Sequence, residues 1–367
     1  MSKLSIALLA EAELELLKIK VTLEAEAKEY GAEWLGSGKT VLREGGRFAS
    51  NSSSTLQTPG LSSKSNFDDI FGAPEDRLSC DSSFDKVFKP RVTSAYCNAE
   101  KLSEDLPKAT TEEALAKRVA YMDYKELTNP DTHDLSVKVV QRVLSDRDIE
   151  IEGQIDDPSS GFKAWKFNSK AGDRPMLVAT GTETKGLADI RADLMGNVGY
   201  DQYELNAKKI GDYLEEEAAK GNKVEVSGHS LGGALTQMIV ASHPDKISKA
   251  ITFNAAGVPE TVNAEYEENV AKTGSRPEIT HHIAEGDAVS LAGERFLDGN
   301  IKISGGYGNA MDAHLAMVDG HQEKSISRAE LESPNYEVKY LGRTMTRQDE
   351  HKYRAAVQPV LNKIFRS

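Results

Sequence analysis

Residues 224–236 read Val-Glu-Val-Ser-Gly-His-Ser-Leu-Gly-Gly-Ala-Leu-Thr, a short apolar strand that runs into a Gly-X-Ser-X-Gly turn and then a helix. A serine hydroxyl becomes a useful nucleophile when it is exposed beside a base and near donors for an oxyanion. The sharp strand-to-helix turn does this for Ser230, and Gly228 and Gly232 remove side chains that would clash within it. The motif alone also arises by chance, but the strand before it and the helix after it favour a nucleophile elbow with Ser230 as the catalytic nucleophile.

Length, composition and charge limit the classes of protein to consider. A chain of 367 residues holds one large α/β domain with an extra segment, or two modest domains. Its 39% apolar and 28% charged residues are ordinary for a soluble globular protein. The net charge of −13 argues against nucleic acid as a partner and against strongly anionic membranes. Neutral, zwitterionic and sugar-headed lipids remain open as partners.

The N-terminal residues, the longest uncharged stretch and the two cysteines favour a cytoplasmic protein that is at most peripheral to a membrane. The apolar run at residues 4–10 is shorter than the core of an export signal. The longest uncharged stretch, residues 228–243, contains the elbow and its helix, so no transmembrane segment is expected. Cys80 and Cys97 cannot form a disulfide framework, and two reduced thiols are favoured over a single bridge.

Three parts are expected along the chain. Residues 1–43 begin with Leu, Ala, Glu and Lys at helical spacing and predict an N-terminal amphipathic helical segment. Residues 44–106 are rich in Gly, Ser and Asn at their start and predict a flexible or irregular linker. Residues 107–367 are expected to form the α/β domain. The first 100 residues either bind a protein partner or cover the domain.

The expected α/β domain alternates apolar strands with helical segments. Strands are expected over 162–167, 176–179, 224–226, 250–253, 279–283 and 301–304, with 336–341 as a further candidate. Helices are expected over 110–126, 134–146, 200–219, 262–272 and 346–365. Strands separated by helices predict a mainly parallel sheet with helices on both faces.

An activated serine needs a base, and the base needs an orienting acid. On a scaffold with this elbow, the acid and then the base follow the serine in the chain, each on a loop after a strand. Asp287 comes directly after the strand expected at 279–283, and Asp298 and Glu285 are the alternative acids.

Three histidines follow Asp287: His314, His321 and His351. His314 comes soon after the strand at 301–304 and a glycine-rich loop, so it is favoured as the base, with the other two as alternatives. His229 sits beside the nucleophile on the wrong side to be its base, and a local packing or hydrogen-bonding role is expected for it.

An oxyanion hole requires two N–H donors. The residue after the nucleophile, Leu231, supplies one, and a loop after an earlier strand supplies the other. Thr182 follows the strand at 176–179 and is the second candidate. The alternative is that Gly181-Thr182 forms an ordinary strand-ending turn.

Taken together, these motifs resemble those of the class 3 (fungal-type) lipases over roughly residues 110–320. The motifs that carry the resemblance are Gly181-Thr182, Asp189, Asp193-Leu194, the block Val-Ser-Gly-His-Ser-Leu-Gly-Gly-Ala-Leu at 226–235 and Thr-Phe-Asn-Ala-Ala-Gly at 252–257. The resemblance implies an α/β-hydrolase fold, carboxylic ester hydrolysis through an acyl-enzyme, and neither a metal nor an organic cofactor. Carried over by motif, it implies that Ser230 is the nucleophile, Asp287 the acid and His314 the base, with Thr182 and Leu231 as the oxyanion hole.

The chain departs from the family pattern at two places. Ile190 stands where the family usually has tryptophan, and Asn254-Ala255-Ala256-Gly257 replaces the usual Phe/Tyr-Gly-X-Pro turn. The family places a lid over residues 183–200, where a plain surface helix is the alternative reading.

The sequence therefore predicts a serine hydrolase that cleaves acyl esters of lipids, possessing either lipase or A1-type phospholipid or galactolipid acyl hydrolase activity. Its substrate would lie at a membrane or lipid-droplet surface. A short-chain soluble esterase and a non-catalytic, lipase-like binding or regulatory protein are the alternatives.

Overall fold

A computed structural model of the chain describes residues 32–35, 39–42, 99–181, 199–287, 289–307, 310–319, 323–340 and 343–352. The chain divides into two compact units: residues 66–344, and residues 1–65 together with 345–367. The larger unit contains the sheet, its helices and the predicted site.

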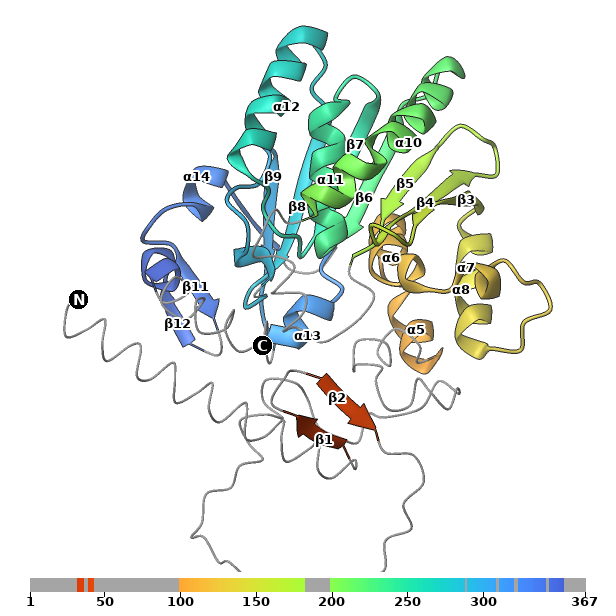
Figure 1. Ribbon diagram of the computed structural model, residues 1–367, viewed down its shortest axis with the longest axis horizontal. Coiled ribbons are helices and arrows are strands. Elements are labelled where there is room, and N and C mark those ends of the chain that lie inside the picture. Colours follow the sequence, from red (N-terminus) through yellow and green to blue (C-terminus); the bar gives the residue numbers. More distant parts are fainter. Residues whose placement is uncertain are drawn as a thin grey trace, which may run out of the picture. The chain divides into compact units, whose positions relative to one another are not determined.

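One eight-stranded sheet organises the larger unit (Figure 1), in the order β10-β9-β8-β7-β6-β5-β4-β3. Its strands are β3 (Ile149–Asp157), β4 (Phe162–Ser169), β5 (Met176–Ala179), β6 (Val224–His229), β7 (Ile247–Phe253), β8 (Glu278–Ala284), β9 (Asn300–Ser304) and β10 (Glu323–Ile326). The run from β5 to β9 is parallel, whereas β3, β4 and β10 are antiparallel to their neighbours. The predicted α/β class with a mainly parallel sheet is confirmed.

The central strands are buried along most of their length because both faces of the sheet are covered. In β5, Leu177 and Ala179 belong to the hydrophobic core on one face, whereas Met176 and Val178 belong to the core on the other. All four side chains are buried. This two-sided burial explains why the sequence predicted β5 with its correct ends.

Three helices cover one face of the sheet: α10 (Tyr200–Ala219), α11 (Leu231–Ser242) and α12 (Glu260–Thr273). They connect β5, β6, β7 and β8, which are adjacent in space and in sequence. Crossovers between parallel strands share one hand, so successive connections in the same direction place their helices on the same face.

The helices that precede the sheet cover its other face. They are α5 (Ala99–Asp105), α6 (Thr111–Lys117), the 3-10 turn η2 (Val119–Tyr121), α7 (Tyr124–Leu127) and α8 (Leu135–Asp146). Leu102 and Leu106 are buried in the core on this face, and the Trp165 indole donates to the carbonyl of Ala120 at 3.0 Å. Residues 99–106, which the sequence placed in a linker, are therefore part of the packed larger unit.

Other differences from the expected elements lie at edges and ends. The sheet has edge strands β3 and β10 that were not predicted, and the helix expected over 110–126 is broken into α6, η2 and α7. Within the segment 1–43, β1 (Ala32–Leu35) and β2 (Lys39–Leu42) form an antiparallel pair and not a helix. Residues 1–31 and 353–367 lie outside the described residues. The strand predicted at 336–341 is present as β11 (Glu337–Tyr340), which forms a small sheet with β12 (Arg343–Thr346).

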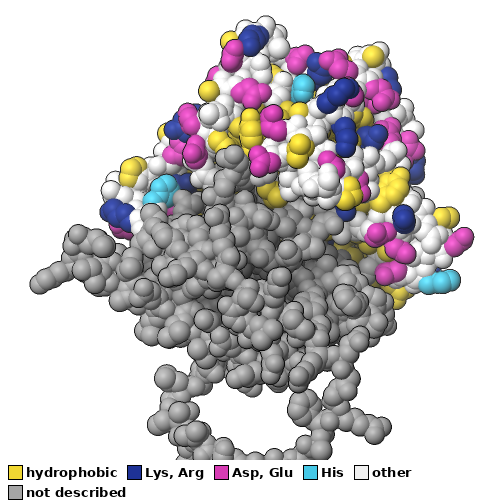
Figure 2. Space-filling view, viewed as in Figure 1, with side chains coloured by type: hydrophobic (Ala, Val, Ile, Leu, Met, Phe, Trp, Pro, Cys, Tyr) yellow, Lys and Arg dark blue, Asp and Glu magenta, His cyan; other side chains and the backbone are white. Residues whose placement is uncertain are grey.

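The surface over α10 and α12 carries acidic and basic side chains interspersed with each other (Figure 2). Several are paired, including Lys208 with Asp212 at 2.6 Å and Lys272 with Glu268 at 2.7 Å. Within the described part of the chain, no helix combines the length and the hydrophobicity that crossing a bilayer requires.

Candidate active site

Ser230 lies at the turn from β6 into α11, with φ 60° and ψ −128°. A non-glycine residue with positive φ is uncommon and costs free energy that the surrounding structure must offset. Ser230 is 1% exposed, and its N–H donates to the carbonyl of Phe253 at the end of β7 at 3.1 Å. The turn therefore holds the serine in one strained conformation at the carboxyl edge of the sheet.

Close backbone packing explains the two motif glycines. A Cβ atom at Gly228 would collide with the carbonyl of Gly232, and one at Gly232 would collide with the carbonyl of Ala179. The elbow can tighten to this degree because both positions lack side chains.

The structure brings Asp287 and His314 together. The Nδ1 atom of His314 lies 2.9 Å from Oδ1 of Asp287, and both side chains are buried. Asp287 follows β8, and His314 lies in α13 (Ala310–Leu315), which follows β9. Because Nδ1 faces a carboxylate, it carries the proton, which leaves Nε2 free to accept one.

Asp287 is held by residues that follow it directly in the chain. Its carboxylate accepts hydrogen bonds from the N–H of Val289 at 3.1 Å, from the N–H of Ser290 at 3.0 Å and from the Ser290 hydroxyl. These donors at the start of η3 (Val289–Leu291) fix the orientation of the carboxylate.

His314 is held through its backbone carbonyl by two side chains from neighbouring strand ends. The side-chain amide of Asn254 donates to this carbonyl at 2.8 Å, and Nε2 of His229 lies 2.9 Å from it. Complete burial lowers the pKa of His229 well below its usual value, so the ring is neutral. Its Nε2 therefore donates to His314, and its Nδ1 accepts from the hydroxyl of Tyr121 at 2.9 Å.

Helix α6 holds the residues that follow His314. Arg118, at its end, donates to the carbonyl of Leu315 at 3.1 Å, and Lys117 donates to the carbonyl of Ala316. The Glu113 carboxylate accepts from the backbone N–H groups of residues 318 and 319. Glu113 and Lys117 form an ion pair at 3.3 Å in which both side chains are fully buried.

Of the two oxyanion-hole candidates, Leu231 is among the described residues and Thr182 is not. Leu231 is the first residue of α11, and the N–H of a first helical residue has no acceptor within its own helix. The residue before Thr182, Gly181, lies against the nucleophile: a Cβ atom at Gly181 would be 3.3 Å from Cβ of Ser230.

The remaining candidates lie elsewhere. Asp298 is exposed and pairs with Arg276 at 3.7 Å. His351 is half exposed and lies 3.6 Å from Glu350, whereas His321 and the lid segment 183–198 lie outside the described residues. Of the acids that follow β8, Asp287 is the one that pairs with His314. The Ser230 hydroxyl has no hydrogen-bond partner within the described part of the chain.

A family profile described as the Tle-like phospholipase domain matches residues 112–345, the segment that contains the elbow, the acid and the histidine. The chain belongs to this family. Its fold and its family are those of a lipase- or phospholipase-like hydrolase.

Several solved lipase structures resemble this phospholipase-like domain at low identity. Lipase II from Rhizopus niveus is 16% identical, with 59% of this chain and 87% of that chain covered and a TM-score of 0.38. The triacylglycerol lipase from Penicillium expansum is 17% identical, with 47% and 82% covered and a TM-score of 0.34. Lip2 lipase from Yarrowia lipolytica is 17% identical, with 52% and 76% covered and a TM-score of 0.37. No match was found among curated proteins.

One group of side chains in the described part of the domain has the atoms to hold a metal ion: His282, Asp319 and Glu323. Nδ1 of His282 already lies 2.6 Å from Oε1 of Glu323, whose other oxygen lies 3.5 Å from Lys302. Asp319 in turn accepts from the Thr110 hydroxyl at 2.8 Å. These contacts link β8 with the segment after α13.

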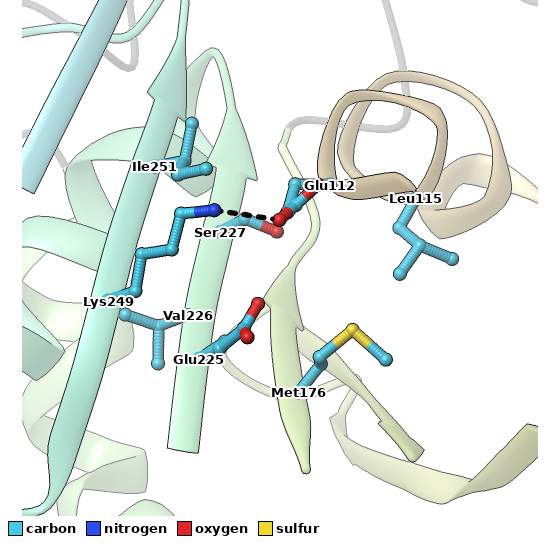
Figure 3. A pocket seen from close by; sticks show the side chains of 8 residues that line it. All are labelled: Glu112, Leu115, Met176, Glu225, Val226, Ser227, Lys249 and Ile251. Atoms are coloured by element: carbon cyan, nitrogen blue, oxygen red, sulfur yellow. Dashed lines mark hydrogen bonds and ion pairs between the residues drawn. The ribbon is translucent and has the colours of Figure 1, made fainter. Parts of the chain in front are cut away.

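A small cavity between α6 and the sheet is separate from the elbow (Figure 3). It measures about 10 Å³, and acidic and basic side chains lie at its rim, with Lys249 donating to Glu112 at 2.9 Å. A space of this size holds at most one water molecule. It therefore cannot hold an acyl chain.

Proposed function

We propose that this phospholipase-like domain hydrolyses carboxylic acyl esters of lipids, with phospholipids as the first candidates, through an acyl-enzyme on Ser230. The observation that carries the proposal is the strained Ser230, whose hydroxyl has no hydrogen-bond partner among the described residues, at the same sheet edge as a buried Asp287–His314 pair. The family match favours phospholipids among the lipid esters.

In the proposed reaction, the Ser230 hydroxyl attacks the ester carbonyl while Nε2 of His314 takes its proton. Asp287 keeps the ring in the required tautomer and stabilises the imidazolium that forms. The N–H of Leu231 and that of Thr182 would bind the oxyanion. His314 then protonates the leaving alcohol, and a water molecule that it deprotonates releases the acid from Ser230.

Ester hydrolysis by the full chain and by Ser230→Ala tests this proposal. The substrates are p-nitrophenyl esters of short and long acyl chains, then vesicles of phosphatidylcholine, vesicles of galactolipid and emulsions of triacylglycerol. Release of fatty acid from phosphatidylcholine vesicles by the wild type alone is expected.

Activity confined to short p-nitrophenyl esters would mean that the protein is a soluble esterase and not a lipid hydrolase. Equal background signals from both proteins on every substrate would contradict the enzyme proposal and favour a lipase-like binding protein.

A further inference from the structure

We infer that Asn254 is a positioning residue that ties the strand leading to the catalytic acid to the helix that carries the base. The inference rests on the proposed function, in which Asp287 and His314 act on Ser230. Asn254 follows β7, which lies between the serine strand β6 and the acid strand β8.

The side-chain amide of Asn254 forms hydrogen bonds through both its nitrogen and its oxygen. Its Nδ2 donates to the carbonyls of Ala313 at 2.9 Å and His314 at 2.8 Å, and its Oδ1 accepts from the N–H of Ala284 at 2.8 Å. Ala284 is the last residue of β8, three positions before Asp287. One amide group therefore joins the two segments that must bring the acid and the base within 2.9 Å of each other.

The backbone of Asn254 suits asparagine in particular. Its φ of 46° lies in the left-handed region, which asparagine tolerates better than most other side chains. Glycine would also accept this backbone but would supply no donor. Asn254 is fully buried, so its replacement leaves three buried backbone groups without their protein partner.

Local structure alone does not hold His314. Helix α13 has only six residues, and isolated helices of this length are unstable. The carbonyl of His314 instead receives donors from Asn254 and His229, which follow or end the two adjacent strands β7 and β6. Loss of the Asn254 donors is expected to let the ring shift relative to Asp287, and small shifts of a catalytic group are costly in rate.

The test compares Asn254→Gly, which keeps the positive φ, with Asn254→Asp, which keeps the acceptor for Ala284 but loses the donors. Asn206→Ala is the matched control, because Asn206 is also fully buried and donates to Ser160 at 2.9 Å and to Gln202 at 3.0 Å within α10 and its neighbours. Two readouts are used: ester hydrolysis, and the downfield proton resonance of the His314 Nδ1–H, assigned by its loss in Asp287→Asn.

Both Asn254 variants are expected to lower kcat by roughly tenfold or more with KM unchanged, and to shift or broaden the His314 resonance. Asn206→Ala is expected to leave kcat and the resonance as in the wild type. If Asn254→Gly does not fold, Asn254→Asp decides the question.

Wild-type kcat and an unchanged resonance in either folded Asn254 variant would overturn the inference. If the wild type hydrolyses no ester faster than Ser230→Ala, the proposed function fails, and the resonance alone still decides whether Asn254 positions His314.

Discussion

The acid and the base of the proposed triad are held in opposite ways. Asp287 is oriented by Val289 and Ser290, two and three residues further along the chain. His314 is oriented from afar, through its own carbonyl and those after it, by β6, by β7 and by α6, which lies about two hundred residues earlier in the sequence. The acid half of the site therefore depends on a local turn, whereas the half that carries the base depends on the assembly of the whole domain.

The strongest expected effect comes from breaking the contact between the two halves. Asp287→Asn would present an amide to Nδ1 of His314 and favour the wrong tautomer. We expect kcat to fall by roughly 10⁴-fold with the fold intact. Steady-state kinetics beside circular dichroism would check this, and near-normal kcat in a folded variant would remove Asp287 from the triad.

Substitutions in the half that holds His314 are expected to act by lowering the stability of the domain. Glu113→Ala would leave the buried Lys117 without its counter-ion, at a cost of about 3–5 kcal/mol in the free energy of unfolding. The matched control is Glu104→Ala, because Glu104 and Lys108 form the same i,i+4 pair at 3.1 Å but are 70% exposed. Loss of an exposed pair is expected to cost about 1 kcal/mol or less.

Urea unfolding of the three proteins measures both costs. Equal small losses in the two variants would mean that the buried pair does not hold the segment after His314.

The pH dependence of unfolding tests whether Lys117, which helps to hold the segment after His314, is buried as the structure shows. Burial is the main cause that lowers the pKa of Lys117 from 10.5 to about 8, although Glu113 opposes the shift. Between pH 8 and pH 10.5, Lys117 is protonated in the unfolded chain but not in the folded chain. The contribution of Lys117 to the free energy of unfolding therefore increases as the pH rises. The unfolding free energy of the wild type, minus that of Lys117→Met, should therefore rise from pH 8 to pH 10.5.

Subtraction of the variant removes the titration of the other groups. A flat difference across this pH range would mean that Lys117 keeps its proton, and a falling difference would mean that its pKa is raised.

The local half is expected to be the more tolerant one. Ser290→Ala removes one hydroxyl donor from Asp287 but leaves the two backbone N–H donors. We expect a kcat loss of roughly tenfold, in the range for one hydrogen bond to a charged group, with a melting temperature close to that of the wild type. A loss as large as that of Asp287→Asn would show that the hydroxyl and not the turn orients the acid.

The same contrast explains what the sequence could predict. The central strands and the elbow were readable because burial on both faces makes β5 apolar and places apolar residues along β6 to β8, and because the turn at Ser230 needs Gly228 and Gly232. The edge strands β3 and β10 escaped prediction because they carry many charged or polar residues and bury few apolar ones.

Long-range roles were not readable. Glu113 and Lys117 have the i,i+4 spacing of an ordinary surface pair, and only the fold buries them. Asn254 was noted as a departure from the family turn, but its three hydrogen bonds depend on β8 and α13 lying beside it. The signal that could have suggested its role is an asparagine directly after a strand, at the start of a turn that departs from the family pattern.

The most direct test of the proposed serine hydrolase is covalent labelling by a fluorophosphonate, which reacts with an activated serine without any choice of lipid. Intact-mass measurement and peptide mapping would be applied to the wild type, Ser230→Ala and His314→Ala. One adduct is expected on Ser230 of the wild type and none on the two variants. An unlabelled wild-type protein, or an adduct on another residue, would contradict the proposal.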